Sequence, residues 1–379
     1  MSAYLACLGT RPEIIKMAPV YRSLKQRGHT VQVLHTGQHD DMAHALYRFF
    51  DMVPDHCMQL QRKVATLSHL TAELMQGVDT QVAQARPDVV LVQGDTASAL
   101  AGAMVGYFRH IPVAHIEAGL RTGLDDPFPE EKNRELIGRL ASWHFPPTHQ
   151  ATTNLLREGI PSQQIFEVGN TVIDTALWVK HRLLHEQLEP ELAPDVFQFL
   201  QTHLPARLVL VTAHRRENWG QPIRLIASAV GVLLQRHRDL VMVWPMHPNP
   251  SVREDIQAVA HSWPADCRER LCLTEPLAYP GLISLLANSD FTLTDSGGIQ
   301  EEASALRRPV LITRDSTERQ ELVDAGGARL VGTDPDHIVE HASRLLRDPG
   351  TYRAMQLRQS PFGDGQSSQR IADILTRMH

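Results

Sequence analysis

The sequence predicts an α/β fold made of two Rossmann-like, doubly wound parallel sheets, and three features point to it. Short apolar runs alternate with longer segments whose apolar residues have helical spacing. This alternation is typical of parallel strands that helices cover on both faces. It runs once to about residue 168 and starts again near residue 205. The 379 residues also exceed what one hydrophobic core usually holds, so two domains are expected.

The candidate strands are eight short apolar runs rich in residues that favour strands. They are residues 3–8, 30–36, 88–93 and 111–116 in the first half, and 207–212, 240–244, 290–294 and 309–313 in the second. Segments with the apolar spacing of helices lie between them, at residues 13–27, 96–109, 222–237 and 296–306.

The domain boundary is expected near residues 168–176, "VGNTVIDTA", which precede a long polar helical stretch. This boundary gives a first domain over residues 1–170 and a second over residues 171–360. The tail, residues 366–378, has the spacing of a last amphipathic helix. No internal repeat or low-complexity tract interrupts the pattern.

The composition argues against several classes of protein. A net charge of -6 without a concentrated basic segment disfavours a general nucleic-acid binder. No apolar run approaches the roughly 20 residues of a membrane span, and no signal peptide is apparent. The four cysteines lack C-x-x-C spacing, and His35 and His39 straddle a strand end, so no metal site is expected. We therefore expect a cytoplasmic protein that binds neither membranes nor nucleic acid.

Polar clusters follow six of the expected strands, at the ends where ligands bind in open parallel sheets. They are "GTRPEIIK" with Arg11 and Lys16, "GDT" with Asp95, "EAG" with Glu117, "AHRREN" with His214 and Arg215, "DSGGIQEEA" with Ser296, and "RDSTER" with Arg319. Facing domains would direct all six into one interdomain cleft. Taken singly, the clusters have simpler explanations: Asp95 and Ser296 are possible helix N-caps, and the arginines beside His214 a solvated edge.

The segment "DSGGIQEEA" has the clearest physical logic. Ser296, Gly297 and Gly298 begin a helix whose unpaired backbone N–H groups and dipole favour an anion. The spacing is neither that of a P-loop nor G-x-G-x-x-G. Together with the cations of the other clusters, it predicts a nucleoside diphosphate site in which a nearby glutamate accepts hydrogen bonds from ribose hydroxyls.

Carboxylates gather in "HIEAGLRTGLDDPFPEEKNREL", residues 115–136. Glu117 ends an apolar strand, and Glu130 and Glu131 begin a helix after a proline-bounded loop. Acids facing a cationic diphosphate site suit elimination of a nucleotide from a sugar, because cations stabilise the departing diphosphate and a carboxylate of raised pKa removes a proton. The simpler alternative is that Glu130 and Glu131 are first-turn acids that favour the helix dipole.

Nine motifs in order closely resemble the bacterial non-hydrolysing UDP-N-acetylglucosamine 2-epimerases, and the match runs from residue 9 to about residue 375. They are "GTRPEIIKMAPV", "GQH", "QGDT", "HIEAGLRTG…PFPEEKNR", "VGNTVIDT", "VTAHRREN", "TDSGGIQEEA", "RDSTER" and "VGTD". The resemblance implies two Rossmann-like domains of the GT-B type, with the last helix, about residues 361–379, crossing back to the first domain. It also implies a homodimer.

The implied activity is reversible conversion of UDP-N-acetylglucosamine (UDP-GlcNAc) to UDP-N-acetylmannosamine (UDP-ManNAc), without metal or cofactor. UDP is eliminated to give 2-acetamidoglucal and is then added back, and the product supplies ManNAc for cell-surface polysaccharide. The resemblance places the catalytic residues at Asp95, Glu117, Glu130 and His214. It places the contacts to substrate and UDP at Arg11, Lys16, Arg215, Leu277, Leu282, Ser296, Gly297, Gly298, Glu302 and Arg319.

The sequence departs from the family pattern in several places, one of which is Gln320 where a proline usually follows "TER". The loop before "PEE" is one residue shorter than usual, so Glu130 rather than Glu131 is chosen by alignment. Leu282 stands where an aromatic residue usually lies near the uracil. Many members also bind a second UDP-GlcNAc as an activator through a "QHRQ"-like turn and an arginine. Here Gln38, His39 and His247 are the candidates for that site, but the turn is "QHDD" and Val64 replaces the arginine, changes that should weaken binding of a diphosphate.

Other functions would use a similar nucleotide-sugar site. A hydrolysing 2-epimerase would release ManNAc and UDP, but that subfamily lacks the "EAGLRTG…PEE" form. A GT-B glycosyltransferase would need an acceptor pocket, and no membrane-facing amphipathic helix is apparent. A non-catalytic nucleotide-sugar sensor would have lost the acids, all of which are present.

Overall fold

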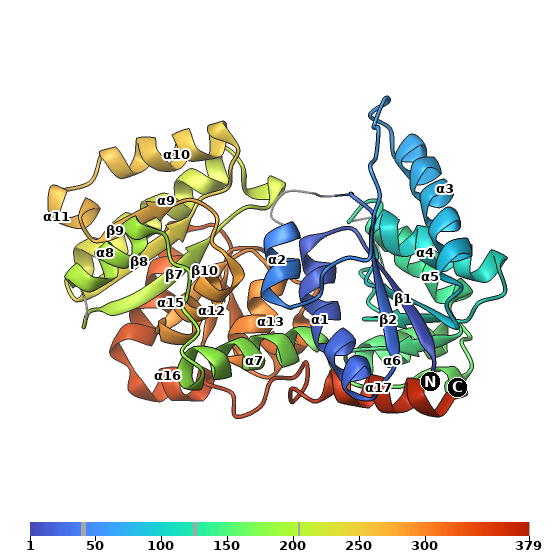
Figure 1. The fold of residues 1–379 in the computed structure, drawn as a ribbon. Helices are drawn as coiled ribbons and strands as arrows, with labels where there is room; N and C mark the ends of the chain where they lie inside the picture. The colour runs from blue at the N-terminus through green and yellow to red at the C-terminus, as the bar shows by residue number, and fades with distance from the viewer. Residues whose placement is uncertain (39–42, 124–126, 204, 379) are drawn as a thin grey trace. The chain divides into compact units, whose positions relative to one another are not determined.

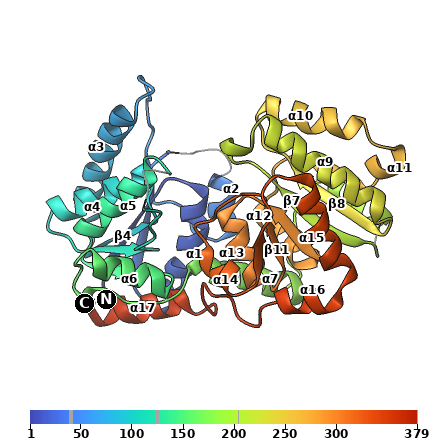
Figure 2. The same cartoon turned by 180° about the vertical axis from the view of Figure 1, so that it is seen from behind.

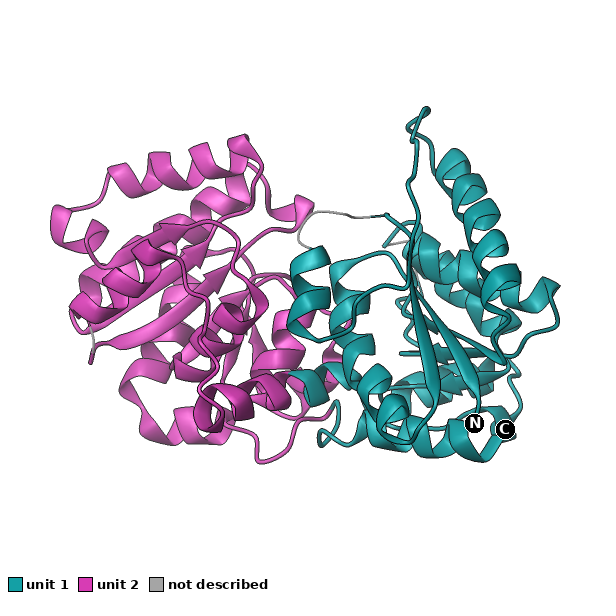
Figure 3. Cartoon of the chain, in the orientation of Figure 1, with its two compact units in different colours: residues 1–175, 362–379 teal, residues 176–361 magenta. Residues whose placement is uncertain are grey.

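The chain divides into two compact units in the computed structural model, which describes residues 1–38, 43–123, 127–203 and 205–378. Unit 1 comprises residues 1–175 and 362–379, and unit 2 comprises residues 176–361 (Figure 3). The C-terminal segment therefore belongs to the same unit as the N-terminus.

Unit 1 is built on a six-stranded parallel sheet in the order β3-β2-β1-β4-β5-β6. Its strands are β1 (Ala3–Leu8), β2 (Thr30–His35), β3 (His56–Cys57), β4 (Val89–Gln93), β5 (Val113–Ile116) and β6 (Trp143–Phe145). This is the strand order of a doubly wound Rossmann sheet.

Helices cover both faces of this sheet (Figures 1 and 2). They are α1 (Arg11–Gln26), α2 (Ala43–Phe49), α3 (Leu67–Ala85), α4 (Ala97–Phe108), α5 (Glu130–Leu140), α6 (His149–Arg157), the short η1 (Ser162–Gln164), the start of α7 (Thr171–His185) and α17 (Ser367–Met378). Residues of α3, α4 and α5 form one core cluster with the strands, while α1 packs against α17.

Two glycines of helix α4, Gly102 and Gly106, face the strands of the sheet. A Cβ on Gly102 would lie 2.9 Å from Val92 and 3.1 Å from Cys7, so no larger residue fits there without a shift. Thr96 is the N-cap residue of this helix, and its side chain accepts a hydrogen bond from the Ala99 N–H at 3.0 Å. This close packing fixes the loop between β4 and α4, which carries Asp95.

Unit 2 has a second six-stranded parallel sheet, in the order β12-β11-β10-β7-β8-β9. Its strands are β7 (Arg207–Thr212), β8 (Leu240–Pro245), β9 (Leu271–Thr274), β10 (Phe291–Thr294), β11 (Val310–Ile312) and β12 (Ala328–Leu330). Read from its other edge, this order is β9-β8-β7-β10-β11-β12, that is, the third, second, first, fourth, fifth and sixth strands of the unit. Unit 1 has the same order, so the two units share one topology.

The helices of unit 2 also lie on both faces of its sheet (Figures 1 and 2). They are the rest of α7, α8 (Pro194–His203), η2 (Arg216–Asn218), α9 (Gln221–Arg236), α10 (Pro250–His261), α11 (Ala265–Arg268), α12 (Tyr279–Asn288), α13 (Gly297–Ala305), α14 (Gln320–Asp324), α15 (Pro335–Arg347) and α16 (Pro349–Met355). Residues of α9, α10 and α15 form one core cluster with the strands. None of the described helices in either unit has the length and apolar character that crossing a membrane requires.

The predicted fold class, two Rossmann-like doubly wound parallel sheets, is confirmed. All eight predicted strands are present, although the run 111–116 forms a strand only from Val113. The sequence-based prediction missed β3, β6, β9 and β12, which have two to four residues each and lie at the four edges of the sheets.

The chain reverses direction across each sheet at one point, between β1 and β4 in unit 1 and between β7 and β10 in unit 2. In open α/β sheets, ligands bind beyond the carboxyl ends of the strands at this switch point. Each unit therefore has one position where a ligand site is expected on topology alone.

Candidate active site

Glu117 follows β5 at the carboxyl edge of the unit 1 sheet and has a left-handed backbone, with φ of 64°. This conformation is unfavourable for a residue with a side chain and is most often retained at functional sites. It directs the carboxylate towards the neighbouring strand end, because Glu117 Oε2 lies 3.6 Å from the position that a Cβ on Gly94 would take. Glu117 is therefore held beside the loop that carries Asp95.

Three donors hold the Glu117 carboxylate, whose side chain is only 8% exposed. Lys16 of α1 forms an ion pair with Oε1, Asn170 Nδ2 donates to Oε1 at 2.8 Å, and Gln93 Nε2 donates to Oε2 at 2.5 Å. Because one of these donors is a cation, they favour an ionised carboxylate, and together they fix its orientation. Lys16, predicted to contact a diphosphate, is thus paired with a carboxylate in this structure.

Asp95 is clamped by two neighbouring residues of α5. Arg134 Nη2 lies 2.5 Å from Asp95 Oδ2, and Asn133 Nδ2 donates to the Asp95 carbonyl oxygen at 2.8 Å. Burial raises the pKa of the Asp95 carboxyl group, Arg134 opposes this rise and the charge of Glu117 adds to it. A carboxylate with a raised pKa is a stronger base near neutral pH.

The two glutamates at the start of α5 have different surroundings. Glu131 is buried, and its Oε1 accepts hydrogen bonds from the backbone N–H groups of Thr122 and Gly123 at 3.0 and 3.3 Å. Its Oε2 lies 3.2 Å from Arg134 Nη1. Glu130 is the first residue of the helix and is partly exposed. Glu131 is thus held by the backbone of Thr122 and Gly123 and by Arg134, whereas Glu130 remains partly exposed.

A further carboxylate, Glu13, is buried at the switch point of unit 1. It accepts hydrogen bonds from the Gly9 N–H at 3.0 Å, from the Thr10 hydroxyl at 2.8 Å and from the Thr96 hydroxyl at 2.8 Å. Burial raises the pKa of Glu13 to about 7, although these hydrogen bonds oppose the rise. Glu13 therefore ties the loop after β1 to the loop after β4.

Unit 2 presents the N-terminus of α13 at its switch point. Ser296 precedes the helix and its hydroxyl oxygen faces the Ile299 N–H at 3.5 Å, while its own N–H donates to Thr294 Oγ1 at 3.0 Å. A Cβ on Gly297 would lie 3.2 Å from the guanidinium carbon of Arg319, and Arg319 Nε donates to Glu301 Oε1 at 2.8 Å. Helix dipole and guanidinium therefore lie together, which suits an anionic ligand.

His214 follows β7, and its ring contacts the buried carboxylate of Asp295, which follows β10. Nδ1 of His214 lies 3.1 Å from Asp295 Oδ1. Asp295 also accepts hydrogen bonds from the backbone N–H groups of His214 and Arg215. Burial alone would raise the pKa of Asp295, but the contact with His214 and these donors lower it. The predicted histidine is thus part of a histidine–aspartate pair.

The other predicted nucleotide contacts are spread over both units. Arg11 begins α1 in unit 1. In unit 2, Arg215 lies 3.7 Å from Glu318, and Leu277 is buried just before α12, which contains Leu282. Glu302 is buried as well. Burial first, and then the charge of Glu302, raise the pKa of Tyr279.

Two of the activator candidates, Gln38 and His247, follow strand ends as well. Gln38 Oε1 accepts hydrogen bonds from the N–H and the hydroxyl of Ser98, at 3.1 and 2.7 Å. His247 follows β8 and packs against Trp219, with ring centroids 5.6 Å apart; mainly because it is buried, its pKa is lowered. His39 lies outside the described residues. The described side chains include no cluster of three or more histidine, cysteine, aspartate or glutamate residues able to hold a metal.

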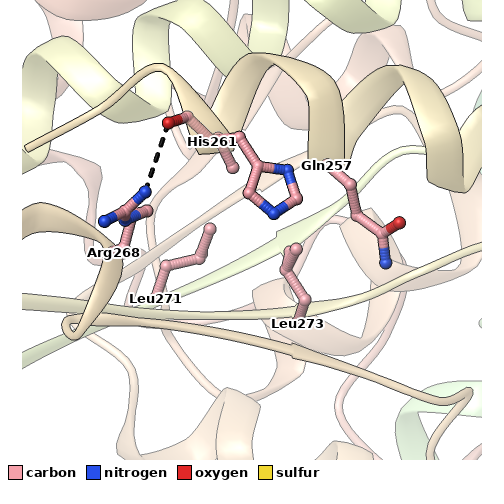
Figure 4. Close-up of a pocket in the computed structure, with 6 residues that line it drawn as sticks. Gln257, His261, Arg268, Leu271 and Leu273 are labelled. Atoms are coloured by element: carbon pink, nitrogen blue, oxygen red, sulfur yellow. Dashed lines mark hydrogen bonds between the residues drawn. The ribbon is translucent and has the colours of Figure 1, made fainter. Parts of the chain in front are cut away.

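One pocket of unit 2 lies away from these residues (Figure 4). It is lined by Gln257, Ala260, His261, Arg268, Leu271 and Leu273, from α10, α11 and the edge strand β9. None of the predicted site residues lines it. Arg268 Nη1 donates to the His261 carbonyl oxygen at 3.2 Å, so the arginine braces the turn between the helices.

Several functional candidates were not predicted, although each lies in or beside a motif that was noticed. Gln93, Asn170, Glu13, Arg134 and Asp295 all contact a predicted residue or its loop. Gln93 and Asn170 stand in "QGDT" and "VGNT", and Asp295 directly precedes Ser296. Their place inside these motifs was the available signal.

Fold and site together define a Rossmann-like protein with carboxylates at one switch point and a glycine-opened helix N-terminus at the other. Residues 22–376 match the family model for UDP-N-acetylglucosamine 2-epimerase. The chain belongs to this family.

Relatives match over almost their whole length. The chain is 42% identical to the UDP-N-acetylglucosamine 2-epimerase of Escherichia coli K12, over 98% of this chain and 97% of the relative. The UDP-GlcNAc 2-epimerase of Neisseria meningitidis, solved with UDP-GlcNAc bound, is 37% identical with a TM-score of 0.88, covering 99% of this chain and 100% of that one. The Methanocaldococcus jannaschii enzyme, solved with UDP-GlcNAc and UDP, is 33% identical with a TM-score of 0.79, and both chains are fully covered.

Proposed function

We propose that this chain interconverts UDP-GlcNAc and UDP-ManNAc by inverting carbon 2 of the sugar, without hydrolysis. The observation that carries the proposal is the pair of carboxylates at the switch point of unit 1. Asp95 has a raised pKa, and Glu117 lies in the adjacent strand end with its orientation fixed by three donors. Inversion at carbon 2 needs a base to remove a proton and an acid to return one, so neighbouring carboxylates suit it.

The substrate assignment is supported by the relatives. The Neisseria meningitidis and Methanocaldococcus jannaschii structures both hold UDP-GlcNAc, and their identities of 37% and 33% extend over their entire chains. We therefore propose UDP-GlcNAc, UDP-ManNAc and UDP as the ligands of this chain.

In the first half-reaction, a carboxylate removes the proton on carbon 2. The electron pair of that C–H bond forms the double bond between carbons 1 and 2, and the bond from carbon 1 to the diphosphate oxygen breaks. The products are 2-acetamidoglucal and UDP. We assign the proton transfers to Asp95, Glu117 and Glu130.

In the second half-reaction, the diphosphate oxygen of UDP adds back to carbon 1 and a proton is delivered to the opposite face of carbon 2. Addition of UDP rather than water makes the reaction non-hydrolysing. At least two proton-carrying groups are needed, one for each face, and a set of three acids provides them.

Unit 2 is assigned the nucleotide. The N-terminus of α13 and Arg319 supply partial and full positive charge for the diphosphate. His214 supplies a group that can hold or protonate the departing oxygen, and Glu302 a carboxylate that can accept from ribose hydroxyls. These assignments need no metal and no organic cofactor.

The physiological setting is proposed on family resemblance alone. We propose a cytoplasmic homodimer whose product feeds the synthesis of cell-surface polysaccharide.

The test is to incubate the purified chain with UDP-GlcNAc alone and follow the anomeric signals by NMR. An epimerase produces UDP-ManNAc up to a constant ratio, and the same ratio is reached from UDP-ManNAc. Accumulation of free ManNAc with UDP would identify a hydrolysing enzyme instead. Binding without turnover would identify a sensor, and turnover only after addition of an acceptor would identify a glycosyltransferase.

A further inference from the structure

Asp295 occupies a central place in the switch point of unit 2. Its side chain is fully buried between the ends of β7 and β10. Oδ2 accepts three hydrogen bonds, each at 2.9 Å, from the backbone N–H groups of His214 and Arg215 and from Asn218 Nδ2. Oδ1 lies 3.1 Å from Nδ1 of His214. The carboxylate thus binds both the backbone and the ring of one residue, which restrains the imidazole at two points.

The chemistry of the two partners fixes the position of a proton. A carboxylate that receives this many N–H donors is ionised and only accepts hydrogen bonds. An approach of 3.1 Å between Nδ1 of His214 and this ionised oxygen is favourable only if Nδ1 carries a proton, so Nε2 carries the lone pair of the neutral ring. The His214 side chain is 45% exposed and its Nδ1 faces the carboxylate, so we expect Nε2 to be the ring nitrogen that meets a ligand.

Asp295 also connects the histidine to the anion-binding helix terminus. It is followed directly by Ser296, which precedes α13. The strand ends on either side are joined through Thr212 and Thr294, whose hydroxyl groups lie 2.6 Å apart. The short connection between β10 and α13, Asp295 and Ser296, therefore positions both the His214 ring and the start of α13.

We propose that Asp295 is a positioning residue that holds His214 in the Nδ1-protonated tautomer, with Nε2 directed at the departing oxygen of the diphosphate. When Nε2 is protonated, the ionised Asp295 stabilises the resulting positive charge, so His214 can give its Nε2 proton to UDP as the sugar bond breaks and recover it as UDP returns. The catalytic part of this inference rests on the proposed epimerase function. The tautomer itself does not depend on that function.

The direct test is long-range ¹H–¹⁵N NMR of protein labelled with ¹⁵N in the histidine rings, recorded at about pH 9, where an imidazole is ordinarily neutral. The His214 signals are assigned by their loss in His214→Asn. We expect a protonated Nδ1 and an unprotonated Nε2 in the unmodified protein. A protonated Nε2 with an unprotonated Nδ1 would overturn the proposal without recourse to any Asp295 variant.

The variant Asp295→Asn then tests the cause. The amide has nearly the same shape and keeps an acceptor for the backbone, but it lacks the charge. We expect the Nε2-protonated tautomer to become the major form, kcat to fall by at least about 10²-fold, and the Kd for UDP to stay within about threefold. If the tautomer is unchanged, or if it changes while kcat stays within threefold, Asp295 does not position His214 for catalysis.

Asp290→Asn is the matched control. Asp290 precedes β10 at its opposite end, where it accepts hydrogen bonds from the Leu208 N–H and from Arg207. It resembles Asp295 in binding both a backbone and a side-chain donor. We expect this variant to leave the His214 tautomer and kcat unchanged. Failure of the epimerase proposal would appear separately, as absence of UDP-ManNAc from the unmodified protein whatever the tautomer.

Discussion

Arg134 Nη2 lies 2.5 Å from Asp95 Oδ2, and its neighbour Asn133 donates to the Asp95 carbonyl oxygen. Both residues lie one turn after Glu130, the first residue of α5. The helix that presents Glu130 therefore also fixes Asp95. We infer that α5 sets two of the three proposed acids relative to each other.

Removing the charge of either carboxylate at the switch point should abolish most turnover. For Asp95→Asn and for Glu117→Gln we expect kcat to fall by roughly 10²–10⁴. Neither substitution touches α13, so the Kd for UDP, measured by calorimetry, should change by less than about threefold. Asp88→Asn is the control. Asp88 lies before β4, at the opposite end of the strand from Asp95, and its side chain accepts a hydrogen bond from the Ala3 N–H. Equal losses of kcat in all three variants would show that the substitutions act by destabilising the sheet of unit 1.

The two glutamates of α5 should separate catalysis from stability. Glu130→Gln should lower kcat by roughly 10²–10⁴ without changing the unfolding midpoint. Glu131→Gln should cost about 1–3 kcal/mol of stability, because its carboxylate holds two backbone N–H groups and Arg134. Turnover and denaturant unfolding of both variants provide the comparison. A folded Glu131→Gln without activity, beside an active Glu130→Gln, would show that the assignment is off by one residue.

Glu13 should make stability depend on pH between about 4.5 and 7. Its pKa rises from 4.5 to about 7 on folding, so the folded state keeps a proton that the unfolded state loses first. The contribution is fully present below pH 4.5 and is lost as pH rises through about 7. Relative to Glu13→Gln, the free energy of unfolding should therefore fall by roughly 2–4 kcal/mol across this window. Denaturant unfolding at a series of pH values measures the difference, and a constant difference would show that Glu13 is not protonated in the fold.

Arg319 should contribute to nucleotide affinity. Its guanidinium lies against Gly297 at the start of α13, so Arg319→Ala should weaken UDP binding by about 10–100-fold. Because Arg319 also pairs with the buried Glu301, the double variant Arg319→Ala with Glu301→Gln separates lost affinity from a buried unpaired charge. Arg224→Ala, which removes a surface pair with Asp255, is the control and should bind UDP normally. Unchanged UDP affinity in the double variant would place the diphosphate elsewhere.

The interior of both sheets could be predicted because β1, β4, β7 and β10 are buried on both faces. The buried strand β4, for example, begins with the four consecutive apolar residues "VVLV", and such an unbroken run is recognisable in the sequence. The four edge strands pair on one side only and have two to four residues. So short a run carries no periodic pattern, and it becomes a strand only because a neighbouring strand is present.

The candidate site was predictable where a residue follows a strand and only partly elsewhere. Asp95, Glu117, His214 and Ser296 stand at strand ends, so topology alone brings them to the expected edge. Their partners depend on contacts distant in sequence. Asn170 meets Glu117 across 53 residues and Asp295 meets His214 across 81, and no local pattern encodes either pairing.

The central claim is that carbon 2 loses its proton during the reaction. Incubation of the unmodified protein with UDP-GlcNAc in deuterated water, followed by NMR and mass spectrometry of both nucleotide sugars, tests it most directly. We predict deuterium at carbon 2 of UDP-ManNAc and also of the returned UDP-GlcNAc, with no accumulation of free ManNAc. Formation of UDP-ManNAc with full retention of the original hydrogen at carbon 2 would contradict elimination and re-addition.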